Sequence, residues 1–147
     1  MRVSEFTAYR VRIPLKKTIR HASHTRDSTD SLIVRCRLSD GTTGWGEGLP
    51  RSYVTGESID NAWDLLRGEE IKPQLGRKFD GLAGAVELCR GFTFGSRPQE
   101  TRDCFGNSAR CAIELSLLDA AARVESVPLS RVAALVPECV AVRQSRP

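Results

Sequence analysis

Long hydrophobic segments are absent from this sequence of 147 residues. No apolar run approaches the roughly 18 residues that a membrane-spanning helix requires. The first residues are followed by alternating polar positions and lack the apolar core of a secretory signal peptide. We therefore expect a cytoplasmic protein with no membrane partner.

Cysteine pairs at metal-binding or redox spacing are also absent. The cysteines are odd in number, include no Cys-x-x-Cys pair, and are Cys36, Cys89, Cys104, Cys111 and Cys139. Such a set indicates neither a disulfide framework nor a zinc site. We expect reduced thiols and no metal site in this chain.

Aromatic residues are scarce, and positive charge is not clustered. Aromatics make up 6% of the chain, and the formal net charge is +4. The basic residues are scattered along the sequence, with Lys16-Lys17 as the one lysine pair. Because a nucleic-acid interface gathers basic residues on one face, the sequence predicts a solvated basic surface and no nucleic-acid partner.

The length leaves room for one domain of ordinary size. The hydrophobic content of 40% suffices for a modest core. A complete (β/α)₈ barrel typically needs about 250 residues. Such a barrel therefore does not fit in this chain beside another domain.

The first third of the sequence has the alternation that is typical of strands. Residues 3–15 alternate imperfectly between apolar and polar side chains and predict a half-buried strand that closes near Pro14. Residues 31–38 and 42–47 flank an Asp-Gly turn signal and predict a β-hairpin. Together these segments predict a three-stranded antiparallel meander.

Two features of the predicted sheet bear on function. Residues 16–30, between the first two strands, are polar and have no apolar periodicity, so we expect a mobile loop. Gly44, Gly46 and Gly48 share one face of the third strand. Without side chains there, another backbone or a helix can approach closely.

The remainder of the chain is predicted to be helical. Apolar residues within 59–66 are spaced for one helical face, after a cap at Ser58 or Thr55 and before an end at Gly68. A second helix is expected over residues 82–89.

The third predicted helix covers residues 109–124 and has two apolar stripes, so it should be covered on two sides. Asn107 or Ser108 is its expected cap. A short helical turn should follow at residues 129–135, and residues 136–147 should form an extended polar tail.

In this order, the pieces resemble the N-terminal capping domain of the enolase superfamily, in its mandelate racemase and muconate lactonizing branch. The resemblance depends on Gly-Trp-Gly-Glu at 44–47, Tyr-Val-Thr-Gly-Glu at 53–57 and Leu-Leu-Asp-Ala-Ala-Ala-Arg at 117–123. It implies an α+β fold, a three-stranded antiparallel meander followed by a bundle of about three helices. The domain would span residues 1–135, and residues 136–147 would lead toward a missing barrel.

The resemblance also implies a function. In such enzymes the cap closes over a barrel whose carboxylates hold a divalent metal and whose lysines or histidine move a proton. The chain would then be the substrate-capping domain of a racemase, epimerase or cycloisomerase that acts on a carboxylate or dipeptide-like substrate. It contains no Lys-x-Lys pair. We therefore expect no catalytic residue and no cofactor here, with Mg²⁺ only in a full-length parent enzyme, so that the chain alone is inactive.

By the same resemblance, residues 16–30 and 48–56 are the two loops that shape the substrate pocket. The candidate substrate-binding residues in them are His21, His24, Arg26 and Tyr53. The histidines titrate near neutral pH, an arginine (Arg20 is a further candidate) can hold a carboxylate, and the tyrosine offers an apolar ring with a polar tip. The simpler interpretation is solvated loop side chains and, for the tyrosine, packing against Pro50 or the sheet.

Two acidic residues are interpreted as architectural. Glu57 is placed in the first turn of the first helix, where a carboxylate offsets unpaired N–H groups. Asp119 and Arg123, four residues apart on the third helix, are expected to form an ion pair.

The expected partner is the barrel domain of a parent enzyme or a second copy of the chain. The alternative function is a stand-alone truncated protein that acts as a self-association or protein-interaction module. Its contact surface would be the third helix, with Leu115, Leu118 and Ala122 left exposed. The capping domain needs a barrel, whereas the module would self-associate without one.

Overall fold

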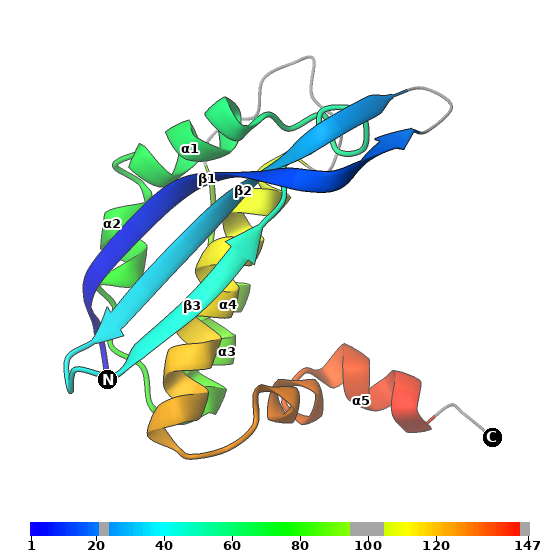
Figure 1. Ribbon diagram of the computed structural model, residues 1–147. Helices are drawn as coiled ribbons and strands as arrows, with labels where there is room; N and C mark the ends of the chain where they lie inside the picture. Colours follow the sequence, from blue (N-terminus) through cyan, green and yellow to red (C-terminus); the bar gives the residue numbers. More distant parts are fainter. Residues whose placement is uncertain (21–23, 95–104, 145–147) are drawn as a thin grey trace.

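A three-stranded sheet carries helices on one of its faces, and the C-terminal helical segment lies away from the sheet (Figure 1). The computed structural model describes residues 1–20, 24–94 and 105–144. The strands are β1 (Val3–Arg20), β2 (Thr25–Leu38) and β3 (Thr43–Gly48), antiparallel in the order β1-β2-β3. The helices are α1 (Ile59–Arg67), α2 (Ile71–Leu75), α3 (Gly81–Arg90), α4 (Asn107–Val124), the 3₁₀ helix η1 (Leu129–Ala134) and α5 (Pro137–Gln144). The predicted α+β meander is confirmed.

The core lies between the sheet and the helices. Alternate residues of β2 point toward the helices and are fully buried; they are Leu32, Val34, Cys36 and Leu38. Cys36 and Leu38 pack in one cluster with Ile113 and Leu117 of α4, and Leu32 and Val34 in another with Ala109 and Ala112. The period of two that predicts the strand is thus the period that fills the core.

The backbones of β3 and α4 lie very close together. A Cβ atom on Gly44, Gly46 or Gly48 would overlap backbone atoms of α4. The helix residues involved are four apart: Ser108, Ala112, Ser116 and Ala120. Two residues of strand rise about 6.6 Å and four residues of helix about 6 Å, so the two repeats stay in step along the contact. The close approach predicted from the glycine spacing is confirmed.

A carboxylate of α4 also holds the outer edge of β3. Asp119 Oδ2 accepts the backbone N–H of Trp45 and the Nε–H of Arg123, both at 3.0 Å. The predicted ion pair is therefore present. The Asp119 carboxylate also satisfies the backbone N–H of Trp45, a donor on an edge strand.

The prediction of a mobile loop at residues 16–30 is wrong for most of the segment. β1 and β2 continue through it as the two arms of a long hairpin, with Ile19 opposite Arg26 and Arg20 opposite Thr25. The register shifts between Pro14 and Ile19. Strand pairing uses backbone groups and needs no apolar face, which is why a polar stretch without periodicity forms strands where it extends beyond the helices (Figure 1).

The two-sided coverage of α4 that its apolar stripes predict is only partly present, because Cys111 and Leu115 of one stripe are exposed. Leu118 and Ala122 are nevertheless buried, at 9% and 3% exposure, by the cluster that includes α3 and η1 residues. Only Leu115 of the expected contact stripe is exposed. The domain itself thus covers most of the surface that was expected to drive self-association.

Two short helices differ from the sequence-based expectation. α2, which contains Pro73, was not predicted because five residues carry too little periodicity. α5 replaces the expected extended tail, starting at Pro137, whose missing N–H is harmless at a first helical position. Glu138 in its first turn pairs with Arg90 of α3 at 3.1 Å.

Candidate functional site

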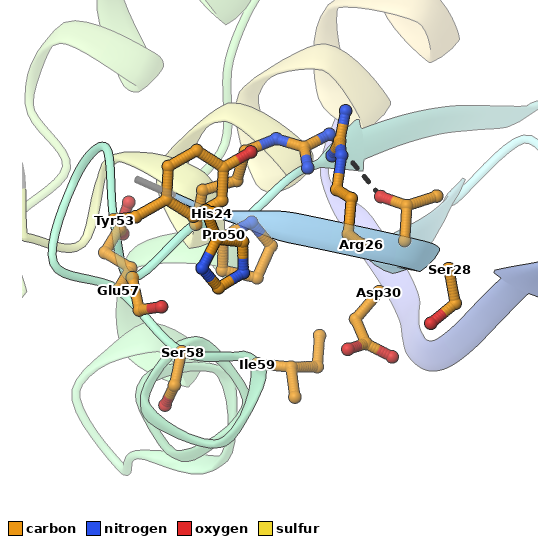
Figure 2. Close-up of a pocket in the computed structure, with 12 residues that line it drawn as sticks. His24, Arg26, Ser28, Asp30, Pro50, Tyr53, Glu57, Ser58 and Ile59 are labelled. Carbon is orange, nitrogen blue, oxygen red and sulfur yellow. Dashed lines mark hydrogen bonds between the residues drawn. The ribbon is translucent and has the colours of Figure 1, made fainter. Parts of the chain in front are cut away.

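A pocket of about 220 Å³ lies between the beginning of β2, the segment that follows β3 and the start of α1 (Figure 2). Residues 24–30 form one wall, with His24, Arg26 and Asp30 among them. Residues 50–53 form the other, and residues 57–59 close the end. The two segments that the resemblance identified as capping loops therefore meet in space.

Three of the four candidate site residues line this pocket. The rings of His24 and Tyr53 are stacked, with centroids 4.5 Å apart and planes inclined by 19°. Arg26 lies beside them on β2 (Figure 2). The fourth candidate, His21, lies outside the described residues. Tyr53 thus packs against a histidine of the hairpin, rather than on the sheet.

Arg26 is the residue in the pocket with unused hydrogen-bonding capacity. Its Nε and Nη1 atoms are shielded from solvent and find no hydrogen-bond partner among the described residues. A buried donor left unpaired costs about 1–3 kcal/mol. Both of these nitrogens are charged donors that form strong hydrogen bonds to carboxylate oxygens, so an anionic ligand that reached them would relieve this cost.

Arg51 is a second guanidinium on the pocket wall, and sequence analysis missed it. Its Nη2 donates to Thr29 Oγ1 at 3.4 Å, which links the segment after β3 to β2. Arg51 is the only basic residue between positions 48 and 56, and that was the available signal. With Arg26 it gives the pocket two positive groups.

Glu57 does not act in the first turn of α1 as expected. That helix is capped by Ser58, whose Oγ accepts the N–H of Asn61 at 3.1 Å, while Asn61 Oδ1 accepts the N–H of Ser58 at 3.2 Å. The Glu57 carboxylate turns instead to α4, where it accepts the N–H of Ser108 at 3.0 Å and its Oγ–H at 2.6 Å. α4 begins after Gly106, which has no side chain to cap it.

Neither a metal-binding cluster nor a buried thiol of lowered pKa is present in the described part of the chain. No cluster of three or more His, Cys, Asp or Glu residues there could hold a metal ion, so the residues do not fit a Mg²⁺ site. Burial raises the pKa of Cys36 to about 12, and burial above all does the same for Cys89. Neither thiol therefore provides a thiolate at neutral pH. In the same residues, no helix is long and apolar enough to cross a membrane.

Comparison with known proteins agrees with the fold and with the sequence motifs. The family profile described as "Mandelate racemase / muconate lactonizing enzyme, N-terminal domain" matches residues 4–133. The L-Ala-D/L-Glu epimerase of Bacillus subtilis is 28% identical over 130 residues, covering 88% of this chain and 32% of that protein. A hydrophobic dipeptide epimerase of Citrifermentans bemidjiense is 29% identical, covering 92% and 35%. The chain thus spans about a third of the length of these relatives.

Solved structures show the same correspondence. The substrate-liganded complex of the Bacillus subtilis epimerase superposes with a TM-score of 0.71 at 27% identity, over 90% of this chain and 34% of that one. A Methylococcus capsulatus dipeptide epimerase, complexed with Mg and the dipeptide L-Arg-D-Lys, has a TM-score of 0.72 at 24% identity, over 90% and 35%. At 24% identity, the similarity to the Methylococcus capsulatus structure supports a shared fold and no more. From its sequence, motifs and fold, the chain belongs to the mandelate racemase and muconate lactonizing enzyme family, of which it forms the N-terminal domain.

Proposed function

We propose that this chain is the substrate-capping domain of a metal-dependent epimerase or racemase that acts on a carboxylate-bearing, dipeptide-like substrate. The cap extends over residues 1–135, and residues 136–147 lead toward the barrel of the parent enzyme. The proposal is carried by the buried, unpaired N–H groups of Arg26 in the pocket between the two capping segments.

The chemistry of the relatives supports this choice of substrate. Several are named as dipeptide epimerases, and the Enterococcus faecalis structure that matches this fold holds Mg and L-Leu-L-Tyr. A dipeptide carries a carboxylate that suits the Arg26 guanidinium. The stacked rings of His24 and Tyr53 offer a flat apolar wall for the rest of such a molecule.

The residues of the pocket support a division in which the cap binds the substrate and the barrel carries out the chemical step. Arg26 binds and orients the substrate carboxylate, while the two capping segments exclude water from the substrate. Proton abstraction next to a carboxylate requires stabilisation of the enolate, which a metal supplies in the enzymes that this chain resembles. The metal ligands and the base are then contributed by the barrel of the parent enzyme, and the isolated cap is inactive.

Arg26→Ala should impair a chimera in which residues 1–135 replace the cap of the Bacillus subtilis epimerase. We expect kcat/KM for epimerisation of an acidic dipeptide to fall about 10- to 100-fold, because a charge-assisted hydrogen bond contributes about 1.5–3 kcal/mol. The steady-state rate of epimerisation measures this. Arg20→Ala is the matched control, since Arg20 lies on the same hairpin but does not line the pocket. Equal rates for the two variants would show that Arg26 does not bind the substrate.

A further inference from the structure

The wall of the pocket that carries Arg51 and Tyr53 is a short segment that is neither helix nor strand. It is the segment of residues 49–56, and a tight turn closes it internally: Arg51 O accepts the N–H groups of Val54 and Thr55 at 3.0 and 2.8 Å. Leu49 and Val54 are exposed, at 41% and 51%. Pro50 of the segment is buried and Tyr53 stacks on His24, so the segment is packed at its centre as well as joined to α4 at its ends.

Both ends of the segment of residues 49–56 adjoin residues that contact Ser108, at the start of α4. Before the segment, the carbonyl oxygen of Ser108 occupies the space that a Cβ atom of Gly48 would need. After the segment, the two carboxylate oxygens of Glu57 accept the N–H and the Oγ–H of Ser108. Ser108 thus lies against the end of β3 with its carbonyl group and binds Glu57, just before α1, with its two donors.

The burial of Glu57 is unusual for a carboxylate and is compensated at this position. Glu57 is 1% exposed, although a buried charge is costly unless it is paired or hydrogen-bonded. Two donors of Ser108 meet it, and the unpaired N–H groups at the start of an α-helix favour a negative charge. Glu57 also lines the pocket, so the same side chain touches the scaffold and the site.

We propose that Glu57 is a positioning residue: by binding Ser108 it sets the segment of residues 49–56 so that the Tyr53 ring lies on His24 and Arg51 reaches Thr29. The consequence for substrate binding rests on the proposed function. The placement of the segment is independent of the proposed function, and it can be measured in the isolated chain.

The test is the NMR chemical shift of the His24 ring protons, which the ring current of a stacked Tyr53 displaces. A Tyr53→Leu variant gives the value without the aromatic ring, and a His21→Gln variant assigns the His24 signals. We expect Glu57→Ala to move the His24 signals most of the way to the Tyr53→Leu value. Glu57→Gln should keep them near wild type, because an amide oxygen accepts the Ser108 N–H and the amide NH₂ donates to its Oγ.

Glu125 provides the matched control. Its Oε1 accepts the N–H of Leu82 at 2.7 Å and so holds the start of α3 as Glu57 holds that of α4, but it does not line the pocket. Glu125→Ala should lower the denaturation midpoint and leave the His24 signals unchanged. If Glu57→Ala does not fold, Ser108→Ala removes only one of the two bonds and should give an intermediate shift.

Two outcomes would overturn the proposal. One is a wild-type His24 shift in folded Glu57→Ala, or in Ser108→Ala if that is the variant that folds. The other is an equal displacement in Glu125→Ala, which would mean that general loosening moves the signal. A failure of the Arg26 chimera test would refute the substrate role and leave this placement intact, so the two hypotheses fail separately.

Discussion

Gly46→Ala is expected to destabilise the domain by about 3 kcal/mol, because its added methyl group would overlap the backbone of α4. The neighbouring atoms are the carbonyl oxygen of Ala112 and the amide nitrogen of Ser116. Neither can move without displacing the helix from the sheet. The free energy of unfolding in urea measures this, and we expect a thermal midpoint lower by about 10 °C.

Gly76→Ala is the control for this substitution. Gly76 has a right-handed helical φ of −71°, and a Cβ atom there would make ordinary contact with Lys72 O at 3.5 Å. We expect a change of less than about 0.5 kcal/mol. Equal stability of the Gly46 and Gly76 variants would show that α4 does not lie on β3 as closely as described.

Leu117→Ala is expected to cost about 3 kcal/mol, and Leu115→Ala less than about 1 kcal/mol. Leu117 is fully buried in the core between the sheet and the helices, whereas Leu115 is 36% exposed on the same helix. Removing buried methyl groups leaves a cavity, and removing exposed ones does not. Urea denaturation of both variants measures the difference.

If Leu115→Ala lost more stability than Leu117→Ala, the described buried and exposed faces of α4 would be wrong. An equal and large loss in both would indicate that Leu115 is covered in solution. In that case α4 would contact another copy of the chain, and the stability of the Leu115 variant would depend on protein concentration.

Local patterns in the sequence were enough to predict the three-stranded meander and the longer helices, but not α2, α5 or the outer part of the hairpin. The β2 alternation, the Asp40-Gly41 turn and the glycine repeat of β3 each reflect a physical requirement of the residues themselves. Burial needs a period of two, a tight turn favours glycine, and a close helix excludes side chains. The cap of α1 was equally predictable because Ser58 binds a residue only three positions away.

The features that were not predicted depend on contacts between distant residues. Glu57 and Ser108 are 51 residues apart, so a local pattern placed the carboxylate in the nearest helix instead. The hairpin arms carry polar side chains, and only the pairing of their backbones makes them strands. Of the candidate site, the sequence indicated the types of residue, but not that His24 and Tyr53 would stack or that Arg51 would join them.

The central claim is that this chain caps an active site that lies elsewhere. The direct measurement is solvent deuterium exchange into the α-position of a dipeptide such as L-Ala-L-Glu, followed by NMR with the purified chain and Mg²⁺. We predict no exchange above the buffer control, since in the proposed function the metal ligands and the base belong to the barrel of the parent enzyme. Exchange that depends on the protein, and that survives repurification, would contradict the claim and show that this chain carries catalytic groups of its own.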